Sequence, residues 1–564
     1  MFIRSRILAT AICAILPLTA MSDPQPGSYL AGRSAAIAND FEASALYFTQ
    51  SRISDPTNPF LLENAMVAYV GLGDFEKAAP IASMMAQSGI KSQMAHIVLS
   101  VTAATNNDWP TVFSQFEQGL KIGPLVDGLT QAWGHVGLGQ MSDALAAFDA
   151  AAAEPGLGAH TLYNKALALA YVGDFEGADA IFSASPRNGI RYNRRSAMVH
   201  AQILSQLDRN DDALALIDGV FGPQTDPTLV ALRGALTAGD VVPFTIIRSA
   251  QDGLSEVYLI VAQALVRDQN DAFTLRYARA AAHLSPMNTD AILLSADLLE
   301  NLQQYDLATS AYSDVPRDDP AFQSAELGRS EALRKAGRSE AAIETLQALA
   351  GAYPDMPRVH ASAGNAYREV ERYADARDSY SVALNLYDDA DPLKWFIYYT
   401  RGISNHALDD WPAAEADFRA ALALNPDQPQ VLNFLGYSMV ELGINMDEAL
   451  QMIETAVAAE PQNGAIVDSL GWVLFQTGAY KEAVGHLEDA AALLPIDPVI
   501  NDHLGDAYWA VGRVIEAEFQ WNRALSFDPT EADAERIRQK LDIGLDAALA
   551  AEGADPLEVA NGDD

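Results

Sequence analysis

Hydrophobic and polar positions near the C-terminal end of the chain repeat at an interval of 34 residues. The stretch from Val467 to Pro495 aligns with the stretch from Asn501 to Pro529. Within each stretch, apolar residues recur every three or four positions, which predicts two amphipathic helices joined by a short turn. The aligned positions are Leu470 and Leu504, Gly471 and Gly505, Ala483 and Ala517, Leu487 and Trp521, Ala490 and Ala524, and Pro495 and Pro529. A period of this length predicts an array of stacked helix pairs.

A small residue in the first helix of each pair can be followed along most of the chain. Its occupants are Gly32, Met66, Ser100, Ala132, Ala166, Ala201, Ala235, Ala262, Ala296, Ser330, Gly364, Gly402, Gly436, Gly471 and Gly505. Small side chains are needed there because packed helix axes lie only about 8–10 Å apart. We therefore predict an all-α solenoid of roughly fifteen antiparallel helix pairs between residues 28 and 530.

Two places interrupt this rhythm. Between Ala235 and Ala262 the step falls to 27 residues, and Pro243 stands among β-branched residues where a second helix should be. We predict a degenerate repeat there, forming a bend or a boundary between two halves. Between Gly364 and Gly402 the step grows to 38 residues around an acidic insertion, which a longer turn explains.

These observations divide the chain into consecutive segments. The last predicted helix has a polar outer face, as a solenoid needs where its final pair would otherwise expose an apolar side. The predicted segments are a signal peptide (1–22), an N-terminal repeat array (23–234), a degenerate repeat or bend (235–261), a C-terminal repeat array (262–530), a capping helix (531–551) and an acidic tail (552–564).

The first residues have the pattern of a secretory signal peptide. Arg4 and Arg6 precede an apolar run of about a dozen residues, which is followed by small residues. A membrane-spanning helix needs about 20 apolar residues, so this run is too short to be one. We expect cleavage after Ala20 or Ser22 and no membrane insertion of the mature chain. The alternative is an apolar first helix of a cytosolic protein.

The only cysteine, Cys13, lies in the middle of this apolar run. A lipoprotein signal needs a small residue directly before its cysteine, and Ile12 stands there instead, which argues against lipid anchoring. After cleavage the chain would contain no cysteine, and hence neither a disulfide nor a thiolate site.

The charge of the chain is strongly negative. Against 36 basic residues stand 75 acidic ones, which gives a net charge of −39. Such a surface repels nucleic acid and anionic lipids, so we expect neither as a partner. The charge either keeps a long solenoid soluble or attracts basic partners.

No motif indicates catalysis, a cofactor or a metal. There is no metal-binding H-E-x-x-H, no serine elbow and no glycine-rich loop after a strand. Asp502, His503 and Asp506 could gather a metal on one helical turn, although a solvated helix face is the simpler interpretation. We therefore expect a binding protein and not an enzyme.

The 34-residue period, with its small residues and closing prolines, resembles the tetratricopeptide-repeat family over nearly the whole mature length. The resemblance implies a right-handed superhelix whose concave groove is lined by the first helix of each pair. In each first helix, four groove positions lie six and three residues before the small residue and one and four residues after it.

In the last four pairs the groove positions are rich in aromatic and acidic residues. We predict a protein-binding groove formed by Tyr399, Asn433, Tyr437, Asp468, Trp472, Phe475, Asp502, Asp506 and Trp509. Aromatic anchors often dominate binding energy, and the acids favour a basic or amino-terminal feature on the ligand. Lysine and arginine are nearly absent, which argues against a C-terminal carboxylate ligand. The alternative is that these pairs curl tightly enough to bury the side chains against one another.

Two blocks, residues 464–484 and 500–525, resemble a narrower group of exported repeat proteins from Gram-negative bacteria. This group includes a lipoprotein adaptor of a periplasmic carboxyl-terminal processing protease, although the present chain lacks the lipidated cysteine. The resemblance implies a periplasmic adaptor or scaffold that binds protein or peptide partners, including a periplasmic protease and its substrates. The alternative is a structural subunit of a cell-envelope assembly or secretion complex.

Overall fold

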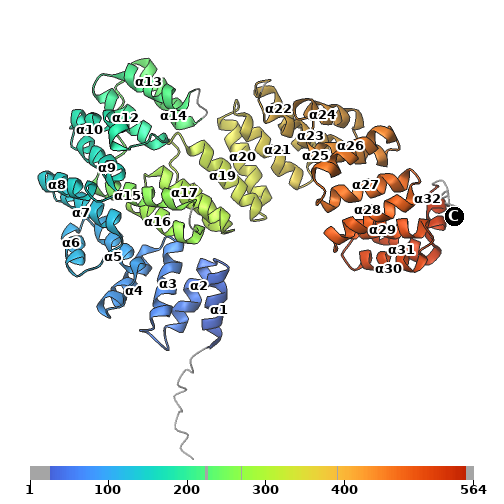
Figure 1. Ribbon diagram of the computed structural model, residues 1–564, viewed down its shortest axis with the longest axis horizontal. Helices are drawn as coiled ribbons and strands as arrows, with labels where there is room; N and C mark the ends of the chain where they lie inside the picture. Colours follow the sequence, from blue (N-terminus) through green and yellow to red (C-terminus); the bar gives the residue numbers. More distant parts are fainter. Residues whose placement is uncertain (1–25, 223–225, 268–269, 390, 554–564) are drawn as a thin grey trace, which may run out of the picture. The chain divides into compact units, whose positions relative to one another are not determined.

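A computed structural model describes residues 26–222, 226–267, 270–389 and 391–553. These residues form helices α1 to α32 joined by turns, without a strand, which confirms the all-α prediction (Figure 1). The predicted signal peptide, with Cys13, lies outside the described residues, as does most of the predicted acidic tail. No described helix is both long and apolar enough to cross a bilayer.

The chain divides into two compact units, Met1–Thr345 and Leu346–Asp564. The helices of the first unit are α1 (Pro26–Ile37), α2 (Phe41–Ser51), α3 (Pro59–Gly71), α4 (Phe75–Gln87), α5 (Gln93–Thr105), α6 (Trp109–Glu117), α7 (Pro124–Gly137), α8 (Met141–Ala152), α9 (Gly158–Tyr171), α10 (Phe175–Ser183), α11 (Ser185–Asn188), α12 (Arg194–Gln206), α13 (Asn210–Phe221), α14 (Pro227–Ala238), α15 (Ala250–Leu265), α16 (Asp271–Leu284), α17 (Thr289–Asn301), α18 (Tyr305–Ser313) and α19 (Phe322–Lys335). Helix α20 (Ser339–Ala352) spans the division.

The second unit continues the helix pairs to the C-terminal end. Its helices are α21 (Pro357–Glu369), α22 (Tyr373–Leu386), α23 (Lys394–Ala407), α24 (Trp411–Leu424), α25 (Pro429–Glu441), α26 (Met446–Ala459), α27 (Gly464–Gln476), α28 (Tyr480–Leu493), α29 (Pro498–Ala510), α30 (Val514–Leu525), α31 (Glu531–Ile543) and α32 (Leu545–Glu552).

The turn inside many pairs combines a left-handed residue with a capping aspartate. Gly73 has a φ of 78°, and the carboxylate of Asp74 then accepts a hydrogen bond of 2.9 Å from the backbone N–H of Lys77. Asp409 and Asp410 play the same two roles before α24, with a φ of 60° and a capping bond of 3.3 Å. The left-handed residue ends one helix and the aspartate starts the next, so the two run antiparallel.

Close approach within each pair explains the small residues. A Cβ added to Gly471 would lie 2.5 Å from Leu487 Cγ, and one added to Gly505 would lie 2.4 Å from Trp521 Nε1. The small residue of the first helix therefore receives the large residue of the second, in the predicted register. Trp521 is fully buried, as expected of a core residue.

Residues 239–249, which lie within the predicted degenerate repeat or bend, contain no helix. The consequence differs from the expectation of a boundary between two halves, because the division of the chain lies at Thr345 and not at residues 235–261. After the interruption, the chain turns back into the first unit. Figure 1 shows α15 and α16 beside helices made some hundred residues earlier. Helix α15 contacts α7 and α9, and α16 contacts α3 and α5.

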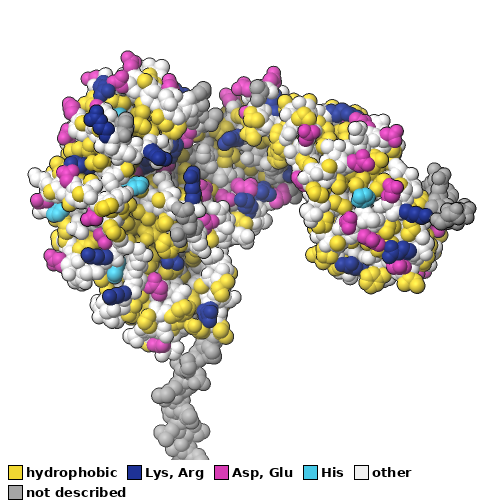
Figure 2. Space-filling model, in the orientation of Figure 1, with side chains coloured by type: hydrophobic (Ala, Val, Ile, Leu, Met, Phe, Trp, Pro, Cys, Tyr) yellow, Lys and Arg dark blue, Asp and Glu magenta, His cyan; other side chains and the backbone are white. Residues whose placement is uncertain are grey.

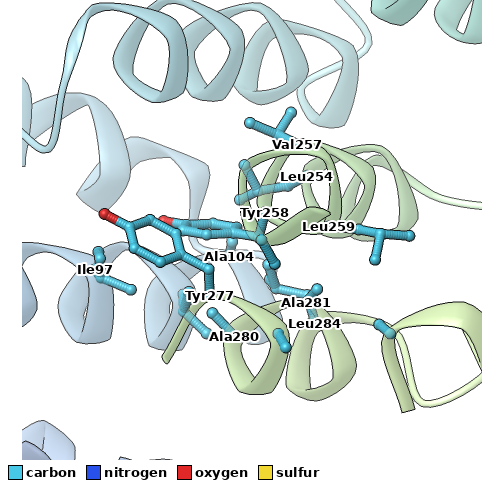
Figure 3. Close-up of a cluster of buried hydrophobic side chains, with 14 of the residues drawn as sticks. Ile97, Ala104, Leu254, Val257, Tyr258, Leu259, Tyr277, Ala280, Ala281 and Leu284 are labelled. Atoms are coloured by element: carbon cyan, nitrogen blue, oxygen red, sulfur yellow. The ribbon is translucent and has the colours of Figure 1, made fainter. Parts of the chain in front are cut away.

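These returning helices lie very close to the earlier ones. A Cβ added to Gly253 of α15 would lie 2.3 Å from the ring of Trp133 in α7. The guanidinium of Arg279 in α16 donates a hydrogen bond of 3.2 Å to the carbonyl of Gly71 at the end of α3. Figure 3 shows Leu254, Tyr258 and Tyr277 packed together with Ile97 of α5. The first unit thus has a core that joins distant repeats, whereas a simple solenoid joins only neighbours.

The C-terminal end consists of two helices, where we predicted one capping helix over residues 531–551. Gly544 separates α31 from α32 with a φ of 81°. A Cβ at Gly544 would lie 2.6 Å from Trp509, so the glycine permits α32 to fold against α29.

Candidate binding groove of the second unit

Two adjoining cavities lie along the first helices of the last repeats. The larger has a volume of about 330 Å³ and is lined by residues of α25, α27, α29 and α31, among them Tyr437, Trp472 and Asp502. The smaller, of about 220 Å³, is lined among others by Asn433 and Asp468. Tyr437 and Val499 contribute to both cavities. The first helices therefore form a continuous groove, which α31 closes at its C-terminal end.

The structure brings five of the nine predicted groove residues to these cavities and leaves four outside them. Those that line a cavity are Asn433, Tyr437, Asp468, Trp472 and Asp502. Those that line neither are Tyr399, Phe475, Asp506 and Trp509. Four of the nine residues of the predicted groove therefore do not border these two cavities.

Even the residues that reach a cavity are mostly covered. Trp472 is 8% exposed, and its neighbour Phe475, which lines neither cavity, is 5% exposed, because both belong to a stack of rings. The Phe475 ring lies 4.9 Å from that of Trp472, which in turn lies 3.9 Å from the imidazole of His503. The interpretation that these side chains bury one another holds for this part of the groove. Trp472 thus presents only an edge to the cavity.

An ion pair fixes the far side of this stack. Nδ1 of His503 lies 3.0 Å from a carboxylate oxygen of Asp468, and both side chains are buried. Burial lowers the pKa of His503, but the carboxylates of Asp468, Asp502 and Asp506 raise it more, and the net pKa lies above the ordinary value. A protonated imidazolium stacked on an indole adds a cation–π attraction. Sequence reasoning treated His503 as a solvated residue and missed this role.

Asp506 is not a groove acid but half of a buried ion pair. It is 1% exposed, and both of its oxygens accept hydrogen bonds from Nζ of Lys540, at 2.8 and 2.7 Å. Trp521 Nε1 donates to the same carboxylate at 2.9 Å. Lys540 also bonds Asp502 at 2.8 Å. Asp502, His503 and Asp506, the residues considered as metal ligands, thus already bond to Lys540, Trp521 or Asp468. Among the described residues, no group of three or more His, Cys, Asp or Glu side chains is placed to hold a metal ion.

Lys540 is the residue that sequence reasoning missed most completely. We took α31 as a cap with a polar outer face, yet Lys540 is buried on its inner face together with Ala534 and Ile537. The spacing of these three residues by three positions was the available signal, since residues three apart share a helix face.

Trp509 and Tyr399 are half-buried by neighbouring elements. Trp509 Nε1 donates a hydrogen bond of 2.9 Å to Asp546 of α32. The Tyr399 ring packs edge-on against Phe434 at 6.3 Å. Both aromatic side chains therefore join repeats together instead of facing a ligand.

In the first unit, the groove positions of α12 are partly covered by a later segment of the chain. On α12 these positions are Arg195, Met198, Gln202 and Ser205. Ser205 Oγ accepts a hydrogen bond of 2.8 Å from the backbone of Val242, and Gln202 Oε1 accepts one of 3.1 Å from Thr245. The Arg195 guanidinium pairs with Glu256 of α15. Residues 242–256 thus contact this face, and a cavity of about 550 Å³ lined among others by Arg195, Met198 and Gln202 remains beside them.

Comparison with known proteins identifies the repeat type. Residues 293–357, 327–394 and 445–498 match the tetratricopeptide repeat. A TPR repeat-containing protein of Pseudomonas aeruginosa is 28% identical over 201 residues, which are 35% of this chain and 33% of that protein. The aspartyl/asparaginyl beta-hydroxylase of Mus musculus is 26% identical over 209 residues, 35% of this chain and 28% of that protein. The chain thus spans about a third of the length of these relatives.

Solved structures resemble the chain in fold. The Cut9–Hcn1 hetero-tetramer covers 92% of this chain at 13% identity, with a TM-score of 0.39 and 96% of that chain covered. Yeast Tom70 covers 94% of this chain at 13% identity, with a TM-score of 0.35 and 97% of that chain covered. The residues that the family model matches, 293–394 and 445–498, are similar to tetratricopeptide repeats, and they stand within a longer array of helix pairs.

Proposed function

We propose that the protein is an adaptor that binds protein or peptide partners in the groove of its second unit. The observation that carries this proposal is the pair of adjoining cavities that share Tyr437 and Val499. Tyr437 is half-buried, and Val499 is 45% exposed at the junction of the cavities. A rigid aromatic side chain beside an exposed aliphatic one is a suitable anchor for a partner, and repeat arrays commonly bind through such concave surfaces.

We further propose that this adaptor works in the periplasm and presents substrates to a protease. Support comes from the signal-peptide pattern at the N-terminal end and from the resemblance of residues 464–484 and 500–525 to exported adaptors. The strongly acidic composition also agrees with partners other than nucleic acid. A cell fractionation that recovers the protein only in the cytoplasm would refute this part without touching the binding function.

The binding function can be tested by capture of partners from an envelope extract. Tyr437→Ala removes the shared anchor, and Val499→Asn makes the junction polar with little loss of volume. We expect each to weaken capture by about tenfold. Ile515→Asn is the matched control, because Ile515 is 81% exposed on α30 and lines neither cavity.

Quantitative mass spectrometry of the captured proteins separates the possible roles. An adaptor should recover a protease together with several substrates in less than equal amounts. Recovery of one complex at a fixed ratio would indicate a structural subunit instead. Equal capture by the wild type and by Tyr437→Ala, with melting temperatures unchanged, would exclude the groove as the binding surface.

A further inference from the structure

The larger cavity carries an excess of negative charge. Its lining includes the acids Glu441, Asp502 and Asp533, and the cations His503 and Arg536. His503 is paired with Asp468, and Arg536 lies 2.8 Å from Glu552, both acids outside this cavity's lining, while Arg536 also lies 4.0 Å from Oδ2 of Asp502. Among the described residues, no basic side chain lies within ion-pair distance of Glu441 or Asp533. The cavity therefore favours a positively charged guest.

One buried acceptor in this cavity has no partner within the chain. Asp502 is 9% exposed, and its Oδ2 accepts a hydrogen bond from Lys540, but its Oδ1 is enclosed without any hydrogen-bond partner. A buried carboxylate oxygen without a donor costs free energy, so such atoms are rare unless a ligand completes them. This unpaired oxygen points to a hydrogen-bond donor on the ligand, independently of the negative charge of the cavity.

The neighbouring cavity repeats the same feature. Asn433 lines it, and the side-chain oxygen of Asn433 is also buried without a partner. The groove thus offers two unused acceptors, one in each cavity, with Tyr437 and Val499 between them. An extended segment carries donors at regular intervals, in its backbone and in basic side chains, and so could reach both acceptors.

We propose that the larger cavity receives the Lys or Arg side chain of an extended partner segment, with Asp502 as its acceptor and Tyr437 beside its aliphatic stem. This inference rests on the proposed binding function and assigns its ligand chemistry. Burial and the charge of Asp506 raise the pKa of Asp502, and a bound cation would offset both effects. Lys540 cannot satisfy the free oxygen, because its ammonium already bonds Asp502 Oδ2 and both oxygens of Asp506.

The test begins with selection of phage-displayed random peptides on the full chain. Selected sequences are then synthesised with acetylated N-termini, so that a terminal amine cannot replace the side chain. Each is compared with an analogue in which the basic residue is norleucine. We expect the wild type to prefer the basic peptide by at least about tenfold, as a buried charge-assisted hydrogen bond should give.

Charge-removing variants assign this preference to the cavity. Asp502→Asn should reduce it to about threefold or less, while Lys540 keeps its bonds to Asp506. Glu441→Gln should reduce it more weakly, and this variant serves if Asp502→Asn unfolds, because Glu441 is exposed. Asp489→Asn on the exposed face of α28 should leave the preference unchanged.

The outcomes separate this inference from the binding function. Peptides that lose affinity with Tyr437→Ala, yet bind equally as basic and norleucine forms, would overturn the charge assignment alone. A preference that survives both Asp502→Asn and Glu441→Gln would place the cation elsewhere and overturn it as well. Failure to select any peptide, or selected peptides indifferent to Tyr437→Ala, would count against the groove and the inference together.

Discussion

At the scale of single residues, glycine is placed where a neighbouring helix allows nothing larger. Gly471 and Gly485 belong to the two helices of one pair, but only Gly471 faces its partner. An added Cβ at Gly471 would lie 2.5 Å from Leu487, while one at Gly485 would meet nothing within 4 Å. A substitution at Gly471 therefore reports the effect of packing on stability, whereas one at Gly485 reports the effect of helix propensity.

We expect Gly471→Ala to lower the free energy of unfolding by about 1–3 kcal/mol, because the methyl group overfills the helix crossing. Gly485→Ala should raise it by about 0.5–1 kcal/mol, since alanine is the better helix former at an open site. Urea denaturation of both variants measures the difference. Equal effects of the two substitutions would contradict the register of the repeats.

The ion pair of His503 predicts a dependence of stability on pH. Because the folded pKa of His503 lies above its ordinary 6.5, protonation stabilises the folded state. This contribution is complete below pH 6.5 and is lost as the pH rises through the folded pKa. NMR titration of the imidazole should give a midpoint above 6.5, and Asp468→Asn should lower that midpoint.

A wild-type midpoint below 6.5 would show that burial outweighs the carboxylates.

The sequence allowed some residues to be placed and not others. The small residues at the helix crossings could be placed because they recur at the period of the repeat. The large side chains that face them, such as Leu487 opposite Gly471, confirm their positions. Trp472 and Phe475 were assigned to an open surface because their positions follow the groove pattern. Helix α27 is buried on nearly all sides, however. Its run of apolar residues was the signal for that, since a helix that is apolar all round is buried.

At the scale of helices, α31 locks the end of the array from inside. Lys540 is its anchor, with an ammonium wholly enclosed by Asp502, Asp506 and the Trp521 ring. The sequence predicted a final helix here but could not predict the inward lysine, because its acidic partners lie more than thirty residues away on another helix.

We expect Lys540→Met to lower the free energy of unfolding by about 3–5 kcal/mol, because it leaves two buried carboxylates without a counter-charge. Hydrogen exchange should show the loss first in α31 and α32. Arg538→Met is the control, since Arg538 is exposed and its ion pair within the part of the chain that the structure describes is with Glu531. A similar small loss in both variants would mean that the ion pairs of Lys540 do not stabilise the end of the array.

At the non-helical residues 239–249, too, the sequence predicted the local structure but not the contacts with distant parts of the chain. Pro243 and its β-branched neighbours excluded a helix, as observed. Where the chain goes afterwards depends on contacts across more than a hundred residues, such as the hydrogen bond between Gln251 and Asn107. No local pattern encodes a contact of that range.

At the scale of the whole molecule, the two units differ in how their cores are connected. In the second unit each helix packs mainly on its neighbours in sequence, whereas in the first α15 and α16 join repeats that are far apart in sequence. On the face shown in Figure 2, acidic and basic side chains are interspersed on each unit.

We expect Tyr258→Ala to weaken α5, α7 and α16 together, because Tyr258 is fully buried where α15 meets them. The loss in the free energy of unfolding should be about 3–5 kcal/mol. Hydrogen exchange by mass spectrometry would detect it as lost protection in all three helices. Val241→Ala, at an exposed position before α15, is the control. Lost protection in α15 alone would show that the earlier repeats hold their structure without it.

The packing of α15 and α16 against earlier helices also sets the order in which the parts of the protein can fold during synthesis. A growing chain that has reached α14 has made most of the first unit, but not the helices on which α3, α5, α7 and α9 pack. Those repeats must wait until about Leu284 has been synthesised, and until then their apolar faces stay open to chaperones and to other chains. The second unit has no such delay, since each new pair finds its partner already made.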